Sequence, residues 1–287
     1  MRNLKYYLKK AYQEKFSIGQ FNFSDWSQVK GIVVAAQNLK SPIILGTSEG
    51  ESKFVGLEEA VAMRNVLRKK TGLPIFLNLD HGKSFEILKE AIMAGYDMVH
   101  FDGSKLLLEE NIKISKKVVN FAKKKGVVVE GEIGKIGKDA SRVYIDKFEI
   151  NEEDLTNVEE SKIYYNKTKV DILAVSVGTF HGMNINGASP NIRLDRLKEI
   201  KEKINIPLVL HGGSGTPEED IKEAIKLGIV KININTETRL AFTGTLRQVL
   251  ENDKTEITPY KYLKEPILAV QEVIEKNINL FGSAGKI

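Results

Sequence analysis

Three of the four histidines in this chain share one sequence context. His81, His181 and His211 each lie at or shortly after the end of an apolar run, and each is followed directly by glycine. Three imidazoles bind zinc well and leave the fourth position of a tetrahedral site open for a substrate oxygen. If the fold brings them together, they predict a catalytic zinc site. The fourth histidine, His100, lies inside an apolar run two residues before Asp102, and we expect it to pack in the core.

Two polar segments late in the chain predict an anion site. Residues 211–215 read His-Gly-Gly-Ser-Gly, so backbone N–H groups can approach an anion closely and the Ser214 hydroxyl adds a donor. Residues 233–237 read Asn-Ile-Asn-Thr-Glu and would complete a phosphate cradle, with Thr236 near a helix N-terminus.

Ser48 and Arg239 are candidates for a second phosphate site. Ser48 follows a short apolar run, and Arg239 follows the polar segment just described. Simpler roles explain them equally well, because serine is a common helix N-cap and arginine is common on surfaces.

Carboxylates near the histidines could move protons. Asp80 precedes His81, so in a regular strand its side chain would point to the opposite face, and it reaches the site only if the strand end bends. Asp102 and Glu132 also end apolar runs. They are close enough to the expected site to bind metal or to orient a ligand histidine, or else they cap the following helices.

Apolar runs alternate with amphipathic segments along the whole chain, and glycine and proline separate them. Eight strands, each followed by a helix, predict a single (β/α)8 TIM barrel spanning residues 1–287; an open doubly wound sheet is the alternative. Residues 134–156 are polar and predict a binding loop or lid, and Tyr260–Leu280 predicts an extra C-terminal helical segment. The expected strands are Phe16–Asn22, Pro42–Thr47, Pro74–Asp80, Asp97–Asp102, Gly126–Ile133, Val170–Val177, Ile206–His211 and Val230–Ile234, and the clearest helices are Phe85–Ala94, Leu108–Lys125, Leu194–Lys203 and Glu218–Leu227.

Composition narrows the function classes. The net charge of +5 is spread along the chain, whereas a nucleic-acid-binding protein would concentrate its basic residues on one element. No apolar run is long enough to span a membrane, and the chain has no cysteine, so we expect a cytoplasmic protein without disulfides.

The motifs that carry these residues resemble the class II, metal-dependent ketose-bisphosphate aldolases of the fructose- and tagatose-bisphosphate type. The similarity covers nearly the whole chain in family order. It rests on Gly19-Gln20-Phe21-Asn22, Leu79-Asp80-His81-Gly82, Phe101-Asp102-Gly103-Ser104, Val129-Glu130-Gly131-Glu132, Gly178-Thr179-Phe180-His181-Gly182, Leu210-His211-Gly212-Gly213-Ser214-Gly215 and Lys231-Ile232-Asn233-Ile234-Asn235-Thr236-Glu237.

The resemblance implies a role for each matching position. His81, His181 and His211 would bind zinc, and Asp80 would exchange a proton with the hydroxyl at the cleaved bond. Asp102 and Glu132 match positions that can hold the metal in a withdrawn place, and a monovalent cation (Na⁺ or K⁺) is common in the family. The phosphate of dihydroxyacetone phosphate would be bound by Gly182, Gly212, Ser214, Asn235 and Thr236. The far phosphate would be bound by Ser48 and Arg239. The expected substrate-binding set also includes Asn22, Gly213 and Asn233.

The implied reaction is the reversible cleavage of fructose 1,6-bisphosphate, a lyase reaction of glycolysis and carbohydrate metabolism. Zinc would stabilise the enediolate that forms on the dihydroxyacetone phosphate fragment. A lysine Schiff base is the alternative chemistry, but the sixth expected strand has no lysine, and Lys231 on the eighth is expected to be a charge at the rim or bottom of the barrel.

The loop after the fifth strand departs from the family pattern. Family members usually carry a glutamate there, whereas residues 134–142 read Gly-Lys-Ile-Gly-Lys-Asp-Ala-Ser-Arg, leaving Asp139 or Glu149 to replace it. Tagatose 1,6-bisphosphate or another phosphorylated ketose therefore remains an alternative substrate.

Other classes of protein also remain open. A metal-dependent hydrolase or isomerase on the same barrel and a non-catalytic phosphosugar-binding relative are the alternatives. An open three-histidine site also accepts cobalt, manganese or iron. The family forms homodimers and homotetramers, and a homodimer is expected by resemblance.

Overall fold

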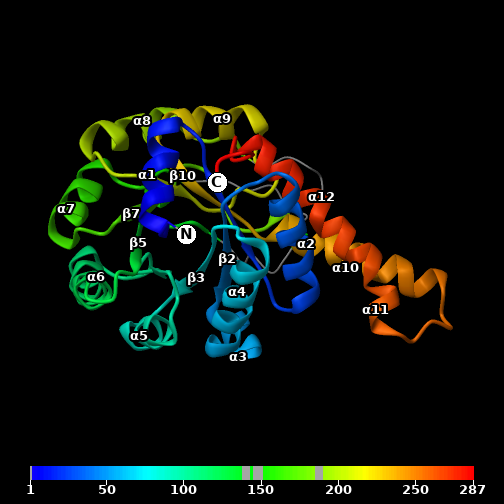
Figure 1. Ribbon diagram of the computed structural model, residues 1–287. Helices are drawn as coiled ribbons and strands as arrows, with labels where there is room; N and C mark the ends of the chain where they lie inside the picture. The colour runs from blue at the N-terminus through cyan, green and yellow to red at the C-terminus, as the bar shows by residue number, and fades with distance from the viewer. Residues whose placement is uncertain (1, 138–142, 145–150, 185–189) are drawn as a thin grey trace.

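The computed structural model of the protein describes residues 2–137, 143–144, 151–184 and 190–287. At its centre lies a closed barrel of eight parallel strands in the order β1-β10-β9-β7-β5-β4-β3-β2, which confirms the predicted TIM barrel over the open sheet (Figure 1). Seven strands begin one or two residues later than predicted, and β10 begins one residue earlier. The strands are β1 Ile18–Asn22, β2 Ile43–Ser48, β3 Ile75–Gly82, β4 Met98–Phe101, β5 Val128–Ile133, β7 Ile172–Val175, β9 Leu208–Leu210 and β10 Ile229–Ile234.

Helices surround the barrel and bury their apolar faces against the strands. Several have the caps that the sequence offers: Ser84 caps the helix that begins at Phe85, and Gly95 ends it with a positive φ of 110°. Within the described residues, no helix is both long and apolar enough to cross a bilayer. The surrounding helices are α2 Trp26–Asn38, α3 Glu49–Val55, α4 Leu57–Thr71, α5 Phe85–Ala94, α6 Leu108–Lys123, α7 Val158–Thr168, α8 Leu194–Lys203, α9 Glu218–Lys226 and α10 Thr236–Asn252.

The predicted C-terminal helical segment is present as two helices, α11 Pro259–Tyr262 and α12 Lys264–Leu280. Helix α12 returns along the barrel between α2 and α10, and its buried Val270 and Ile274 join the main core. The outer part of α10 and the short α11 project away from the barrel (Figure 1).

An N-terminal helix that we did not predict, α1 Leu4–Glu14, packs against the barrel interior from the N-terminal side of the strands. Its buried residues Leu4, Tyr7, Leu8 and Ala11 have helical spacing and contact apolar side chains of the barrel interior, including Phe76. Because this end is filled by apolar side chains, polar chemistry is confined to the opposite end, where active sites of such barrels lie.

The segment between β5 and α7 has more structure than predicted. It contains a 3₁₀ turn, η1 Glu152–Asp154, and a short strand, β6 Val143–Tyr144, which pairs in parallel with β8 Met183–Asn184 beyond the barrel. Asp139 and Glu149, the proposed replacements for the family glutamate, lie outside the described residues.

Candidate active site

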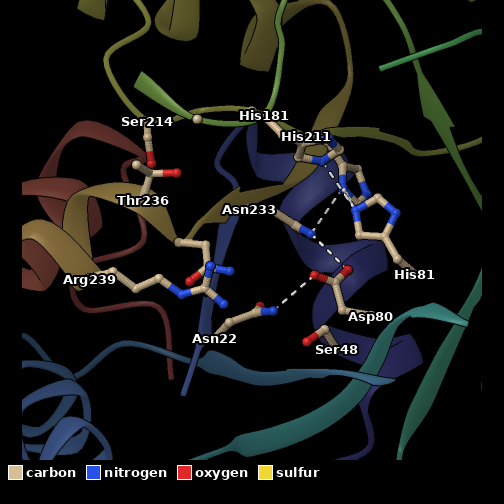
Figure 2. A pocket seen from close by; sticks show the side chains of 13 residues that line it. Asn22, Ser48, Asp80, His81, His181, His211, Ser214, Asn233, Thr236 and Arg239 are labelled. Carbon is tan, nitrogen blue, oxygen red and sulfur yellow. Dashed lines mark hydrogen bonds between the residues drawn. The ribbon is translucent and has the colours of Figure 1, made fainter. Parts of the chain in front are cut away.

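A cavity lies at the C-terminal end of the strands and contains most of the predicted site residues. Figure 2 shows the three histidines on one side, Asp80 between two asparagines in the middle, and Ser214, Thr236 and Arg239 on the other side. The lining consists of Asn22, Ser48, Asp80, His81, His181, Gly182, His211, Gly212, Ser214, Asn233, Asn235, Thr236 and Arg239.

A bend at the end of β3 turns both Asp80 and His81 toward this cavity. His81 has a left-handed backbone with φ 53°, and the pairing of β3 with β4 shifts register between Leu79 and Gly82. Such a bulge places two consecutive side chains on one side of a strand. The condition set by the sequence for Asp80 to reach the site is therefore met.

Two asparagines hold the Asp80 carboxylate. Asn22 on β1 donates from Nδ2 to Oδ2 at 3.1 Å, and Asn233 on β10 donates from Nδ2 to Oδ1 at 3.1 Å. Figure 2 shows these two hydrogen bonds. With both oxygens accepting, the carboxylate is fixed in orientation at the cavity wall.

The three predicted ligand histidines converge. Nε2 of His81 lies 3.1 Å from Nε2 of His181 and 3.1 Å from Nδ1 of His211. Ligand nitrogens around a tetrahedral zinc are separated by about 3.3 Å, because each Zn–N bond is roughly 2.0–2.1 Å. His81 Nε2 is therefore close enough to a nitrogen of His181, and to a nitrogen of His211, for each pair to share a metal ion.

The other nitrogen of each imidazole contacts an oxygen. Nδ1 of His81 lies 2.9 Å from Asp102, Nδ1 of His181 lies 3.2 Å from the carbonyl of Ile136, and Nε2 of His211 lies 2.7 Å from Glu130. An oxygen acceptor at that position keeps the proton on the outer nitrogen and leaves the inner nitrogen's lone pair for a metal. This donor set fits a divalent metal with an open position.

Our prediction that His100 packs in the core agrees with its burial, but its contacts there are polar. Its ring is fully buried, but Nε2 lies 3.0 Å from Glu132 and Nδ1 lies 3.5 Å from Asp80. Nδ1 also accepts a hydrogen bond from the His81 backbone at 3.1 Å. Its inward position on β4 faces the polar centre of the barrel, which the sequence alone does not distinguish from an apolar core.

Lys231 also differs from its prediction as a charge at the rim or bottom of the barrel. It is fully buried inside the barrel, where Nζ lies 2.8 Å from Glu130 and donates to Asn233 at 2.7 Å. Glu130 thus links the lysine to His211. We had not assigned Glu130 a role, although it lies two residues before Glu132 on the same face of β5.

Asp102 and Glu132 lie on the outer side of His81. The ligand atoms of these three residues are within 4.8 Å of one another, and Nδ1 of His81 is 3.7 Å from Glu132. Asp102 also pairs with Lys83. This geometry is compatible with the withdrawn metal position that the family resemblance implies.

The charges of the site shift the pKa values of its groups. Burial favours neutral Asp80, but the surrounding histidines, foremost His81, hold its pKa well below the ordinary value. For His81, burial is outweighed by Asp80 and Asp102, which raise its pKa. For His181, burial lowers the pKa, reinforced by the other two ligand histidines. Asp80 is therefore a carboxylate at neutral pH.

The expected phosphate cradle lies at the start of α10. Gly212 has φ 66°, and a Cβ there would meet the carbonyl oxygen of Phe180 at 2.2 Å, so only glycine fits. The side chains of Ser214 and Thr236 lie next to each other on the side of the cavity opposite the histidines (Figure 2). Among the described residues, Asn235 Oδ1 is buried without a hydrogen-bond partner, which suits a donor from a bound ligand.

Gly213 packs against β10 and is not among the residues that line the cavity. Its backbone N–H donates to Asn233 at 3.2 Å, and an added Cβ would meet Ile232 at 2.7 Å. The close contact with β10 explains glycine at this position without a ligand.

Ser48 and Arg239 meet at a residue that sequence reasoning missed, Glu51. Ser48 is the N-cap of α3, with Glu51 completing a capping box. Arg239 Nη2 lies 2.6 Å from Glu51 Oε1. Ser48 thus has the helix N-cap role that the sequence allowed, and Ser48 and Arg239 both line the cavity.

Comparisons with known proteins agree with the fold. A family model described as "Fructose-bisphosphate aldolase class-II" matches residues 2–286. The chain is 37% identical over 279 residues to sulfofructosephosphate aldolase of Alkalicoccus urumqiensis, covering 97% of this chain and 96% of that protein. It is also 37% identical over 300 residues to fructose-bisphosphate aldolase of Thermus caldophilus, covering 97% of each. The solved structure of the YdjI aldolase from Escherichia coli K12 superposes with a TM-score of 0.82 at 29% identity, covering 100% of this chain and 99% of that chain.

The chain therefore belongs to the class II fructose-bisphosphate aldolase family. It is a metal-dependent aldolase, a lyase that makes or breaks a carbon–carbon bond.

Proposed function

We propose that the protein is a zinc-dependent aldolase that reversibly cleaves fructose 1,6-bisphosphate to dihydroxyacetone phosphate and glyceraldehyde 3-phosphate. Tagatose 1,6-bisphosphate is the nearest alternative substrate. The family and the equal identities to two aldolases with different named substrates support the reaction type more directly than the sugar.

The observation that carries the proposal is how the two ring nitrogens of each of the three histidines are placed. One nitrogen of His181 and one of His211 lie beside His81 Nε2, and the other nitrogen of each of the three rings contacts an oxygen acceptor. A bound zinc ion would supply Lewis-acid stabilisation of the negative charge that develops when the bond breaks. His81, His181 and His211 would hold the ion, and Asp102, Glu130 and the Ile136 carbonyl would orient them.

Asp80 is the proposed acid–base. Its oxygens are oriented by Asn22 and Asn233, and its lowered pKa keeps it ionised. It would take the proton of the sugar hydroxyl at the cleaved bond as the aldehyde leaves, and return that proton in the condensation direction.

The first turn of α10 and the loop after β9 would bind the phosphate of dihydroxyacetone phosphate. The helix N-terminus, the backbone at Gly212 and the hydroxyls of Ser214 and Thr236 offer donors to an anion. Carbonyls near Gly182 and Gly212 would hold a monovalent cation (Na⁺ or K⁺).

We further propose one domain over residues 1–287, a homodimer or homotetramer, and a role in cytoplasmic carbohydrate metabolism such as glycolysis. The projecting part of α10 and α11 supports association, because it exposes apolar side chains that a partner copy would bury. Among them are Leu250, Ile257 and Tyr260, which are 42%, 85% and 72% exposed.

Release of dihydroxyacetone phosphate in a coupled assay tests this function. The zinc-loaded protein should cleave at least one of the two bisphosphates, and the ratio of their kcat/KM values identifies the sugar. Binding of both sugars without cleavage would instead support a non-catalytic relative.

A further inference from the structure

The far end of the substrate cavity carries a buried negative charge that the predicted phosphate site does not explain. Glu51 is 6% exposed and lies directly behind the lining. Its Oε1 contacts Arg239 Nη2 at 2.6 Å, and its Oε2 accepts from Asn22 Nδ2 at 3.1 Å and from the Ser48 backbone at 2.8 Å. All three partners line the cavity.

Glu51 is ionised in this arrangement. Both carboxylate oxygens accept hydrogen bonds, and one of the donors is the Arg239 guanidinium, which has no acceptor atom. A protonated acid would have to donate, and its neighbours here present N–H groups.

Arg239 is the one lysine or arginine in the cavity lining, within the residues that the structure describes. Its charge is matched by Glu51, so the pair contributes no net charge to the far end. A phosphate monoester carries between one and two negative charges at neutral pH, with a second pKa of about 6. Its second charge therefore gains less from Arg239 than it would from an arginine without an acidic partner, because repulsion from Glu51 offsets part of the attraction.

We propose that Glu51 determines substrate specificity at this end, so that ketose 1-phosphates with a singly charged or uncharged far end are used comparably to bisphosphates. A sulfonate or a free hydroxyl is the chemistry that fits. The inference rests on the proposed aldolase function and deepens it. Glu51 acts through Arg239 and is a positioning residue.

Glu51→Gln is the informative change, because it removes the charge and keeps the size that the capping box requires. The kcat/KM values for fructose 1,6-bisphosphate and fructose 1-phosphate are measured for the zinc-loaded wild type and variant. Glu58→Gln, an exposed acid in the first turn of α4, is the matched control. Glu51→Ala is a second variant that removes the cap as well.

In the wild type the two kcat/KM values should lie within about tenfold of each other, because the far end offers no net charge. Glu51→Gln should raise the preference for the bisphosphate about tenfold, through a lower KM for the bisphosphate relative to that for fructose 1-phosphate. Glu58→Gln should leave the preference as in the wild type.

An unchanged preference in Glu51→Gln and Glu51→Ala would overturn the inference, and an equal loss on both sugars would show that Glu51 is only structural. Binding of hexitol 1,6-bisphosphate and hexitol 1-phosphate, measured by calorimetry, gives the same comparison without turnover. If no ketose is cleaved, the proposed function fails, while the hexitol binding ratio still decides the role of Glu51.

Discussion

Asp80 and His81 are consecutive in the chain, yet both side chains reach the same cavity because His81 has a left-handed backbone and β3 shifts register at this point. A proton-transferring group and a metal ligand are thereby placed next to each other. A regular strand would have pointed one of them into the surrounding helices. The bend at the end of β3 is thus the local feature on which the proposed chemistry depends.

Asp80→Asn should abolish most cleavage without removing the metal. The amide keeps the shape but cannot accept the hydroxyl proton, so kcat should fall by about 10²–10⁴-fold. Metal content by atomic emission should match that of the wild type. Unchanged turnover would remove Asp80 from the mechanism.

Glu130→Gln should weaken zinc binding. Glu130 contacts the outer nitrogen of His211 at 2.7 Å, and loss of such a contact lowers metal affinity by roughly 10–100-fold. Competition with a chromophoric chelator measures the affinity, and Glu152→Gln, an exposed acid, is the control. A circular dichroism spectrum like that of the wild type establishes that the variant is folded. Equal zinc affinities in the three proteins would contradict this role for Glu130.

Zinc affinity should rise as the pH increases through the pKa of His81, which lies above the ordinary histidine value. Asp80 and Asp102 raise the pKa of His81 against the effect of burial, so below that pKa a proton competes with the metal for the imidazole. Above it the competition ends. Titrations at several pH values test the sign, and calorimetry in buffers of different ionisation enthalpy should detect proton release. Affinity that does not change as the pH increases would be inconsistent with a protonated His81.

Ser214→Ala should weaken binding of the phosphate near α10. Removing one hydroxyl donor should raise KM by roughly 10–150-fold, because a hydrogen bond to a charged group contributes about 1.5–3 kcal/mol. The inhibition constant of dihydroxyacetone phosphate should rise by the same factor. A KM equal to that of the wild type would place the phosphate elsewhere.

The periodicity of the sequence was sufficient to predict the barrel and most of the residues at the C-terminal ends of its strands. Glycine and proline lay near the ends of the strands, and most of the polar residues after the strands line one cavity, although Asp102 and Glu132 do not. Helix α1 was missed although Leu4, Tyr7, Leu8 and Ala11 carried its helical spacing.

The polar centre of the barrel could not be predicted in this way. His100 and Lys231 lie on β4 and β10, and their roles come from Glu130 and Glu132 on β5. Such cross-strand contacts depend on how the strands are staggered, which a strand's own sequence does not specify. Glu51 was missed for a similar reason, since its partner Arg239 lies 188 residues away.

Metal removal and restoration tests the central claim most directly. Cleavage of fructose 1,6-bisphosphate is measured on the purified protein, after dialysis against a chelator, and after addition of zinc, with zinc content followed in parallel. We predict that activity disappears with the metal and returns with about one zinc per chain, as expected for one three-histidine site. Cleavage that persists in fully metal-free protein would contradict a metal-dependent mechanism at His81, His181 and His211.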